Sequence, residues 1–361
     1  MRALKVVVAA LGVLAVVLVV LWFLGPREPA DLTVRFDPAR IGDDPDAYLA
    51  AEEARFADLR DGQGKGVVHA FPNSRATTPV ALVYLHGFSA SRGEISPVVE
   101  NVSKALGANV VFARLAGHGL DGAAMGEVTV NDWVNDVAEA LTIAERLGER
   151  TVVIGTSTGA TLGAMAALHP DLRGRIDALV QISPNYALKD RRALVLDFPF
   201  AERIVRIIEG EERGFEPVTA LHGERWTTRY PTRAVVTMAA LTRAVRAMTF
   251  ENAAVPTLFM FDEEDRVVDH AVTRRVAERW GRATGALVNI ELIEGTDDPY
   301  RHVIAGDALS PSTSGRVSSI IASWVEQLPL FTRPVGTVVS DNGAGGGEGT
   351  VPAGASDGTA R

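Results

Sequence analysis

The stretch "TVVIGTSTGATLGAMAAL", residues 151–168, decides the fold because it joins a strand pattern to a helix pattern through a serine. A run rich in β-branched residues stops at Gly155, and small helix-forming residues begin after Gly159. Gly-x-Ser-x-Gly between a strand and a helix is the context that a nucleophile elbow requires, and such a turn tolerates little but small residues. The pattern therefore predicts that Ser157 is a nucleophile, with a plain glycine-rich turn as the alternative.

Strand-like and helix-like patterns alternate on both sides of this turn. A helix pattern with Asn or Asp at its start and a glycine at its end covers residues 131–148. The expected strands are 80–87, 109–119 (running into a glycine loop), 150–155, 177–183, 257–262 and 288–294. Apolar strands separated by helices indicate a doubly wound, mainly parallel sheet that is covered on both faces. The ligand site of such a sheet lies beyond the carboxyl ends of its strands.

The pattern changes between residues 185 and 254, where no strand is evident. Two segments in this region, 199–210 and 233–250, have the periodicity of amphipathic helices. About 70 residues without a strand is long for a single crossover. We therefore predict a helical cap inserted over the carboxyl edge of the sheet, with ordinary crossover helices as the alternative.

Candidate partners for Ser157 follow the last two expected strands. A serine hydroxyl needs a base to take its proton and a carboxylate to orient that base. The fold that uses this elbow has the chain order Ser, acid, His. His302 is the only histidine beyond the final expected strand, so it is the predicted base.

The predicted acid is Asp265, in the loop after residues 257–262. It lies a few residues out from the strand, and Val267 and Val268 behind it can anchor the loop in the core. An acid at the strand's last position would be held too near the sheet. The alternatives in the same loop are Asp262, Glu263, Glu264 and Asp269.

Composition restricts the other classes of function. The 361 residues fit one large domain with an insertion. A net charge of −9 without a basic block argues against a nucleic-acid partner. The absence of cysteine excludes disulfides and thiolate metal sites. Neither a nucleotide-binding loop nor a metal-ligand spacing is present, so we expect no cofactor and no metal.

The N-terminus carries an uncharged apolar run at residues 6–25. A helix of about 20 residues spans about 30 Å, the thickness of a bilayer core. Arg2 and Lys5 precede the run, and Trp22 and Phe23 lie where an interfacial aromatic belt would be. We predict a single-pass membrane anchor with the rest of the chain on the extracytoplasmic side. The alternative is a cleaved signal peptide and a secreted protein, although the run is longer than a usual signal core.

Five pieces of the sequence, taken in order, resemble the α/β-hydrolase superfamily, and specifically its monoacylglycerol lipase and carboxylesterase branch with a helical cap. They are "YLHGFSASRGE" (84–94), "RLAGHGLDG" (114–122), "GTSTG" (155–159), "DEEDRVVD" (262–269) and "RHVIAGD" (301–307). The resemblance covers about residues 60–327. It implies an oxyanion hole formed by the backbone N–H groups of Phe88 and Thr158, with His118 in a structural role.

The resemblance implies chemistry more firmly than it implies a substrate. A serine at the elbow implies an acyl-enzyme, whereas related epoxide hydrolases and dehalogenases carry an aspartate there. We therefore expect a carboxylic ester hydrolase that acts on lipophilic or short-chain acyl esters, with acylglycerols among the candidates. A peptidase or thioesterase of the same fold and a non-catalytic membrane-anchored binding protein are the alternatives, and the oligomeric state is left open. The elbow departs from the family, in which an aromatic residue, histidine or methionine often flanks the serine.

The sequence also predicts a division of the chain. Residues 341–361 are polar, glycine-rich and without periodicity, which is typical of disorder. The expected parts are an anchor at 1–30, an α/β-hydrolase domain at 31–335 with its cap at about 185–254, and a disordered tail at 336–361.

Overall fold

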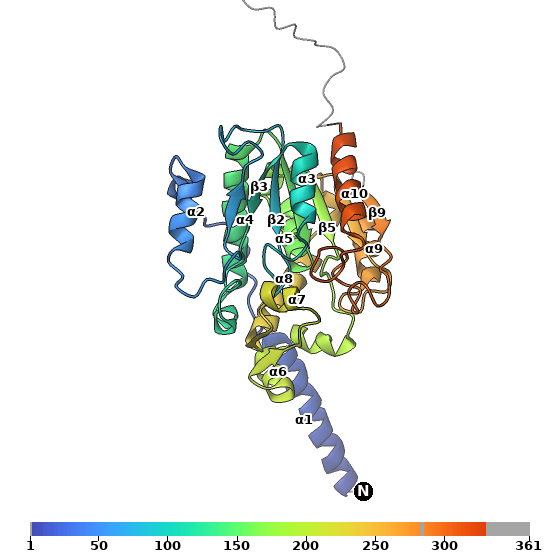
Figure 1. The fold of residues 1–361 in the computed structure, drawn as a ribbon. Helices are drawn as coiled ribbons and strands as arrows, with labels where there is room; N and C mark the ends of the chain where they lie inside the picture. The colour runs from blue at the N-terminus through green and yellow to red at the C-terminus, as the bar shows by residue number, and fades with distance from the viewer. Residues whose placement is uncertain (1, 282–284, 330–361) are drawn as a thin grey trace, which may run out of the picture.

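A seven-stranded sheet forms the centre of the computed structural model, which describes residues 2–281 and 285–329 (Figure 1). Its strands are β1 (Gly66–Val68), β2 (Ala81–Leu85), β3 (Asn109–Phe112), β4 (Thr151–Thr156), β5 (Ala178–Ile182), β8 (Thr257–Phe261) and β9 (Gly285–Asn289). They are arranged in the order β1-β3-β2-β4-β5-β8-β9, and only β1 pairs antiparallel to its neighbour. This confirms the predicted mainly parallel sheet. The strand order reverses between β2 and β4, which is where ligand sites of such sheets lie.

Helices cover both faces of the sheet. One face carries α4 (Val130–Leu147), α5 (Thr158–Leu168), α8 (Arg233–Arg246) and α9 (His270–Arg279), and the other carries α3 (Val98–Leu106) and α10 (Ser314–Gln327). Alternate residues of each strand enter opposite cores, because successive side chains of a strand point to opposite faces. In β2, Val83 belongs to the first core and Tyr84 to the second. The tail predicted at 336–361 lies outside the described residues.

The last strand lies earlier than the sequence indicates. The prediction placed it at 288–294, whereas β9 ends at Asn289. The Ile290 N–H still donates to the Phe261 carbonyl at 2.8 Å, but the Leu292 N–H donates to the Asp262 carboxylate at 3.1 Å. Ile290 and Leu292 are buried, so their apolar alternation reflects packing of a loop on the core. The strand expected at 109–119 likewise ends at Phe112.

Residues 185–254, called the cap segment below, contain helices and a small sheet. They include α6 (Ala201–Glu209), α7 (Ala220–Arg225), α8, and the antiparallel pair β6 (Glu212–Gly214) and β7 (Arg229–Pro231). The prediction that this region lacks strands was therefore wrong. All three residues of β6 are exposed, so no burial pattern marked it.

Short 3-10 helices are η1 (Pro38–Ile41), η2 (Gly122–Gly126), η3 (Arg173–Arg175), η4 (Arg191–Asp197) and η5 (Phe250–Asn252).

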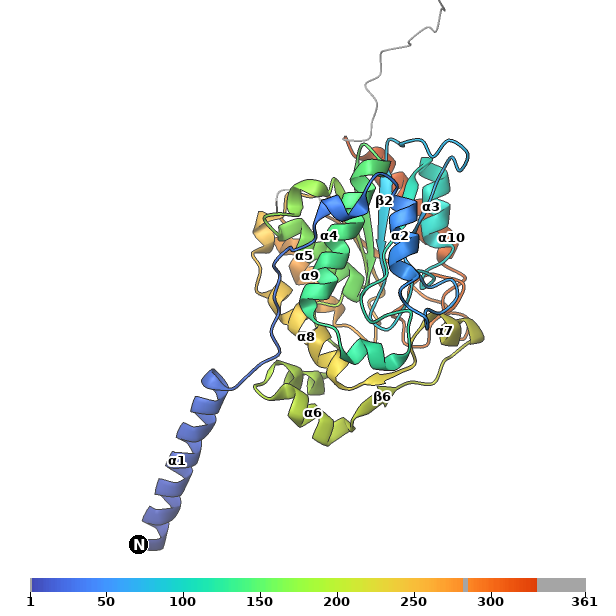
Figure 2. The same cartoon turned by 90° about the vertical axis from the view of Figure 1, so that its left-hand side faces the viewer.

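Helix α1 (Arg2–Leu24) stands apart from the sheet and its helices (Figures 1 and 2). None of its residues is buried, and its 18-residue apolar window has a mean hydropathy of 3.1. It is long and apolar enough to cross a membrane, so it is a candidate anchor. Its carboxyl end reaches the cap segment, where the Trp22 and Phe198 rings pack edge to face with centroids 5.0 Å apart. Helix α2 (Pro45–Glu53) packs beside β1, on the far edge of the sheet.

Candidate active site

Ser157 occupies a sharp turn between β4 and α5. Its backbone has φ 51° and ψ −113°, a conformation that non-glycine residues rarely adopt. The Ser157 N–H donates to the Ile182 carbonyl of β5 at 2.8 Å, which holds the turn against the sheet. A Cβ on Gly159 would lie 2.0 Å from the Leu85 carbonyl oxygen, and one on Gly155 would lie 2.6 Å from the Gly159 carbonyl oxygen. Gly159 is therefore required for α5 to approach β2 so closely, and Gly155 is required for the start of α5 to lie so close to β4.

The structure brings the three residues predicted for the catalytic triad together. His302 Nε2 lies 3.0 Å from Ser157 Oγ, and His302 Nδ1 lies 2.8 Å from Asp265 Oδ2. Ser157 and Asp265 are buried, and the His302 side chain is 12% exposed. These contacts hold the imidazole between a hydroxyl and a carboxylate, the arrangement that general-base activation of a serine needs.

The backbone of His302 is fixed on both sides of its side chain. Its N–H donates to Asp298 Oδ2 at 2.9 Å, and its carbonyl accepts from Ser183 Oγ at 2.7 Å. Asp298 also accepts from the N–H groups of Tyr300 and Val303, so one carboxylate organises the backbone on both sides of His302. The imidazole is therefore oriented by its backbone as well as by its ring contacts.

Asp265 is tied into its own loop by one oxygen and faces His302 with the other. Its Oδ1 accepts from the N–H groups of Val267 and Val268 at 2.7 and 2.9 Å. Val268 is buried and anchors the loop after β8. This carboxylate is therefore held in place before the imidazole contacts it.

The other acids of the loop after β8 have different partners. Asp262 accepts from the N–H groups of Glu264 and Leu292 and forms an ion pair with Arg301 at 2.7 Å. Asp269 caps the amino end of α9 by accepting from the Ala271 N–H at 3.1 Å. Glu263 pairs with Arg274. Each of these carboxylates supports the loop or a helix and makes no contact with His302.

The surroundings of His302 make it a stronger base than a free imidazole. Burial by itself lowers its pKa, because the charged form is desolvated. The negative charges of Asp265, Asp298 and Glu94 act against burial and leave the pKa above the usual 6.5. A raised pKa means that the imidazolium formed on taking a proton is stabilised in place.

Two of the backbone N–H groups near Ser157 that have no partner within the described part of the chain are the expected oxyanion donors. One belongs to Thr158, the first residue of α5, and the other to Phe88, which lines the same cavity as Ser157. The N–H groups on either side of Phe88 are both tied back: that of Gly87 donates to Glu94 Oε2 at 2.7 Å, and that of Ser89 donates to His118 Nε2 at 3.0 Å. Among the three consecutive N–H groups of residues 87–89, only that of Phe88 is therefore free.

His86 and His118 support this loop as neutral imidazoles. His86 Nε2 accepts from the Leu115 N–H at 3.1 Å, so its proton resides on Nδ1, which donates to the Gly87 carbonyl. His118 has the same tautomer, with Nδ1 donating to the Ala116 carbonyl. Burial lowers the pKa of His118 to about 4 and places that of His86 well below its usual value. Both therefore act as hydrogen-bond acceptors for backbone N–H groups.

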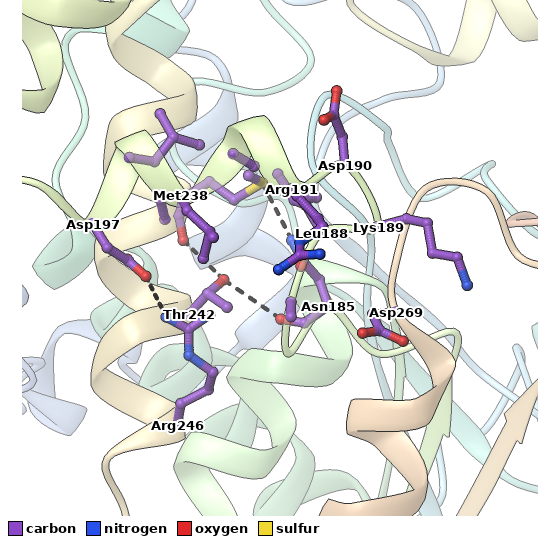
Figure 3. Close-up of a pocket in the computed structure, with 15 residues that line it drawn as sticks. Asn185, Leu188, Lys189, Asp190, Arg191, Asp197, Met238, Thr242, Arg246 and Asp269 are labelled. Carbon is purple, nitrogen blue, oxygen red and sulfur yellow. Dashed lines mark hydrogen bonds and ion pairs between the residues drawn. The ribbon is translucent and has the colours of Figure 1, made fainter.

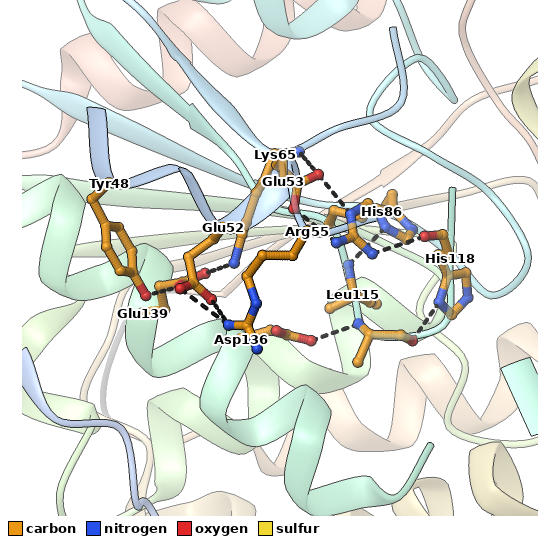
Figure 4. Close-up of polar contacts among 12 residues, drawn as sticks. Tyr48, Glu52, Glu53, Arg55, Lys65, His86, Leu115, His118, Asp136 and Glu139 are labelled. Atoms are coloured by element: carbon orange, nitrogen blue, oxygen red, sulfur yellow. Dashed lines mark hydrogen bonds and ion pairs between the residues drawn. The ribbon is translucent and has the colours of Figure 1, made fainter. Parts of the chain in front are cut away.

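A buried polar network connects this region to the N-terminal segment (Figure 4). Arg114 Nη1 donates to the His118 carbonyl at 3.1 Å, and its Nη2 pairs with Glu53 of α2 at 2.7 Å. Lys65 pairs with Glu139 of α4 at 2.7 Å, and the Tyr48 hydroxyl donates to the same carboxylate. The segment before β1 is thereby bonded to the loop that carries His118.

Glu94 is a residue of this site that the sequence did not single out. Its buried carboxylate accepts from the Tyr84 hydroxyl at 2.9 Å as well as from the Gly87 N–H. Burial raises its pKa to about 7, and these hydrogen bonds lower it only in part. Glu94 lies within the quoted piece 84–94, but nothing in its local pattern distinguishes it from an exposed glutamate.

A cavity of about 780 Å³ opens above Ser157, between the sheet and the cap segment. Its size lies within the range of small-molecule sites, and most of its lining is apolar. Apolar lining residues include Phe88, Leu188, Val205, Met238 and Leu309. A smaller cavity of about 200 Å³ shares Asn185 and Met238 with it and lies between the start of the cap segment and α8 (Figure 3). Within the described residues, no group of three or more His, Asp or Glu side chains is placed to hold a metal.

Comparison with known proteins adds a family and two structural relatives. Residues 82–307 match the model of the alpha/beta hydrolase family. One of the metagenome-derived lipolytic enzymes LipS and LipT shares 18% identity, with a TM-score of 0.59, over 75% of this chain and 100% of its own. A soluble variant of monoglyceride lipase from Saccharomyces cerevisiae shares 13% identity, with a TM-score of 0.51, over 73% of this chain and 91% of its own. At these identities the likeness concerns the fold. No curated protein sequence matches the chain.

Proposed function

The chain belongs to the alpha/beta hydrolase family, and we propose that it is a serine hydrolase that cleaves carboxylic esters with lipophilic acyl groups. The observation that carries the proposal is the contact of His302 with Ser157 on one side and Asp265 on the other, at 3.0 and 2.8 Å. The free N–H groups of Phe88 and Thr158 support it, because an ester hydrolase needs donors where negative charge develops.

In the proposed first half-reaction, Ser157 Oγ attacks the ester carbonyl carbon while His302 Nε2 takes its proton. The carbonyl oxygen becomes an oxyanion that accepts from the N–H groups of Phe88 and Thr158. Collapse of this intermediate breaks the bond to the alcohol oxygen, and His302 gives its proton to that oxygen. The alcohol leaves, and the acyl group remains on Ser157.

In the second half-reaction, His302 takes a proton from water and the resulting hydroxide attacks the acyl carbon. The same two N–H groups bind the oxyanion, and the proton returns from His302 to Ser157 Oγ. A carboxylic acid is released. Asp265 keeps Nδ1 protonated and facing away, so that Nε2 is the atom that exchanges protons in both halves.

The apolar lining of the cavity supports a lipophilic acyl group. Leu188, Val205 and Met238 come from the cap segment or its start, and Leu309 comes from beyond β9. The proposed location is a membrane, with α1 as a single-pass anchor and the catalytic domain on the extracytoplasmic side. Secretion after cleavage of α1 is the alternative.

The function is tested by labelling with a fluorophosphonate probe, followed by a substrate panel. The probe should label the wild-type chain and spare a Ser157→Ala variant, because it reacts only with an activated serine. The panel compares p-nitrophenyl esters, acylglycerols, thioesters and short peptides, and we expect the highest kcat/KM on esters. Faster turnover of thioesters or peptides would reassign the reaction, and absence of both labelling and turnover would indicate a binding protein.

A further inference from the structure

His222 is a buried histidine of the cap segment that the proposed reaction does not use. It lies in α7, is 7% exposed, and lines the cavity above Ser157. Its Nδ1 accepts from the Val218 N–H at 3.1 Å, so the proton of the neutral ring resides on Nε2. Burial lowers the pKa of His222, which favours this neutral form. His222 is therefore a hydrogen-bond donor at Nε2.

This donor is not used by the protein itself. Nε2 of His222 has no hydrogen-bond partner within the described residues. The Nδ1 atoms of His69 and His270 also lack partners but are enclosed by protein, whereas Nε2 of His222 remains accessible beside the cavity. A donor that loses its water to a ligand without an acceptor is left unsatisfied, which costs free energy. The cavity therefore favours a ligand that brings an acceptor to this point.

Aromatic neighbours fix the orientation of the His222 ring. The Phe215 ring stacks on it with centroids 5.1 Å apart, and the Trp226 ring packs against it edge to face at 4.8 Å. Both aromatic residues also line the cavity. The N–H group thus projects from an apolar wall in one orientation. A few polar groups of this kind fix the orientation of a ligand in an otherwise apolar pocket.

Helix α7, which carries His222, is held in place by the segment before β1. Arg60 Nη1 donates to the Trp226 carbonyl and its Nη2 to the Gly223 carbonyl, both at 2.9 Å. Gln63 donates to the Glu224 carbonyl. These carbonyls belong to the carboxyl end of α7 and the residue after it, where a helix leaves acceptors without intrahelical partners. The position of the wall is therefore fixed before a ligand arrives.

The opposite side of the cavity is apolar and is held by the same part of the chain. Arg27 Nε donates to the Asp197 carbonyl of η4 at 3.3 Å, and Arg243 of α8 donates to the Glu28 carbonyl at 2.7 Å. Val205 of α6 packs on η4 and α8 and lines the cavity. The cavity consequently has an apolar side formed by η4, α6 and α8, and a second side formed by α7.

The side formed by α7 adjoins the loop that carries His302. The Thr219 hydroxyl at the start of α7 donates to the Ala308 carbonyl at 2.8 Å. The negative charge of Asp298, which accepts from the His302 N–H, acts on the imidazoles of both His222 and His302. In the proposed reaction His302 gives its proton to the alcohol oxygen. The alcohol portion of the substrate therefore lies on this side.

We propose that His222 Nε2 donates a hydrogen bond to an oxygen in the alcohol portion of the substrate. The preferred substrate is then an ester whose alcohol carries a second acceptor oxygen, while its lipophilic acyl group occupies the apolar side. The inference rests on the function proposed above, because it assigns the substrate of that site. An ester of a hydrocarbon alcohol leaves the Nε2–H unpaired, and sites built around a hydrogen bond discriminate against analogues that lack the partner.

A matched pair of esters tests the role of His222. Methoxyethyl butanoate and butyl butanoate have the same chain length and release the same acid, and they differ by an ether oxygen in place of a methylene. Acid release by the full chain in detergent micelles gives the ratio of the two kcat/KM values. His222→Phe keeps a ring between Phe215 and Trp226 but removes the donor, so it should lower this ratio about tenfold. The reactivity and solubility of the esters cancel, because every variant is compared on the same pair.

A second pair of variants keeps the test independent of the aromatic ring. Glutamine and methionine are similar in length, but only glutamine has an N–H donor. We expect His222→Gln to retain most of the preference and His222→Met to lose it. Tyr230→Phe removes another hydroxyl from the cavity lining and should leave the ratio as in the wild type. Labelling by the fluorophosphonate probe shows which variants are folded with an activated Ser157.

The position of the acceptor is tested on the acyl side. Butyl hexanoate is compared with its analogue that has an ether oxygen beside the terminal methyl group of the acyl chain, and His222→Phe should not change their ratio. A change here, with none for the first pair, would overturn the placement of the alcohol. An unchanged ratio in both His222→Phe and His222→Met, or an equal loss in Tyr230→Phe, would overturn the role of His222. If the wild-type chain hydrolyses none of these esters, the proposed function fails and the inference fails with it.

Discussion

His302 Nε2 lies 3.0 Å from Ser157 Oγ although 145 positions separate the two residues in the chain. Ser157 follows β4 and His302 follows β9, and the strands β5 and β8 lie between them in the sheet. The contact therefore depends on the parallel arrangement of four neighbouring strands, whose carboxyl ends meet at one edge.

Single and double substitution of Ser157 and His302 should show that they act as a unit. Ser157→Ala and His302→Ala should each lower kcat by about 10⁴ or more, and the double variant should be hardly slower than either alone. The measurement is steady-state hydrolysis of a p-nitrophenyl ester, with circular dichroism to confirm folding. A double variant much slower than both single variants would contradict a shared transition state.

Asp265→Asn should lower kcat by about 10⁴, because the amide can no longer hold the Nδ1 proton of His302 in the correct tautomer. The matched control is Asp269→Asn in the same loop, which should be nearly as active as the wild type, because asparagine also caps helices well. If Asp265→Asn kept most of the wild-type kcat and Asp269→Asn lost most of it, the acid of the triad would be Asp269 and not Asp265, although in the same loop.

The acidic limb of the pH profile should report His302. The imidazole acts as a base only when neutral, so kcat/KM should rise with pH through its pKa, which lies above 6.5. In the residual activity of Asp265→Asn this limb should move to lower pH, because the carboxylate that favours the charged imidazole is absent. A limb that stays in place would show that another group controls the profile.

Glu94 should act as a positioning residue for the loop that carries Phe88. Glu94→Ala removes the acceptor for the Gly87 N–H, and we expect kcat to fall about 10- to 100-fold, as the loss of a hydrogen bond to a charged group would predict, with little change in KM. Glu94→Gln keeps an acceptor oxygen and should recover most of the rate. If both variants lose only thermal stability and keep kcat, Glu94 supports the fold alone.

The fate of α1 should be visible by fractionation. The full chain should stay in the membrane fraction after a high-salt wash, because a span of this length is held by burial in the bilayer rather than by charge. Intact-mass measurement of the recovered protein checks that its first residues are present. Recovery in the soluble fraction without those residues would support a cleaved signal peptide.

Most of the main sheet could be predicted because its strands are buried on both faces and therefore read as continuous apolar runs. Four of the predicted strands agree with β2, β4, β5 and β8 to within about two residues. The edge strands were harder. β1 has three residues, and β9 is partly exposed, with more strongly buried residues just beyond its end. Burial marks the centre of a sheet better than its margins.

The candidate site also contains some residues that the sequence could predict and others that it could not. Ser157, His302 and Asp265 could be proposed from chain order and residue chemistry, since each lies at a loop after a recognisable strand. Glu94 could not, because its burial results from the packing of the loop after β2 against Tyr84, which no local pattern encodes. The contacts of Arg27 and Glu28 with the cap segment are similarly invisible in sequence, because they join residues about 170 to 215 positions apart.

The strained turn at Ser157 has a consequence for how this chain can evolve. A non-glycine residue in such a conformation costs about 1–3 kcal/mol, and glycine would adopt it with little penalty. At this position, selection for turnover and selection for a durable fold therefore act in opposite directions. In a duplicated copy that no longer needed to hydrolyse its substrate, replacement of Ser157 by glycine would raise the free energy of unfolding. Such a copy would keep the fold in a more stable form without the nucleophile.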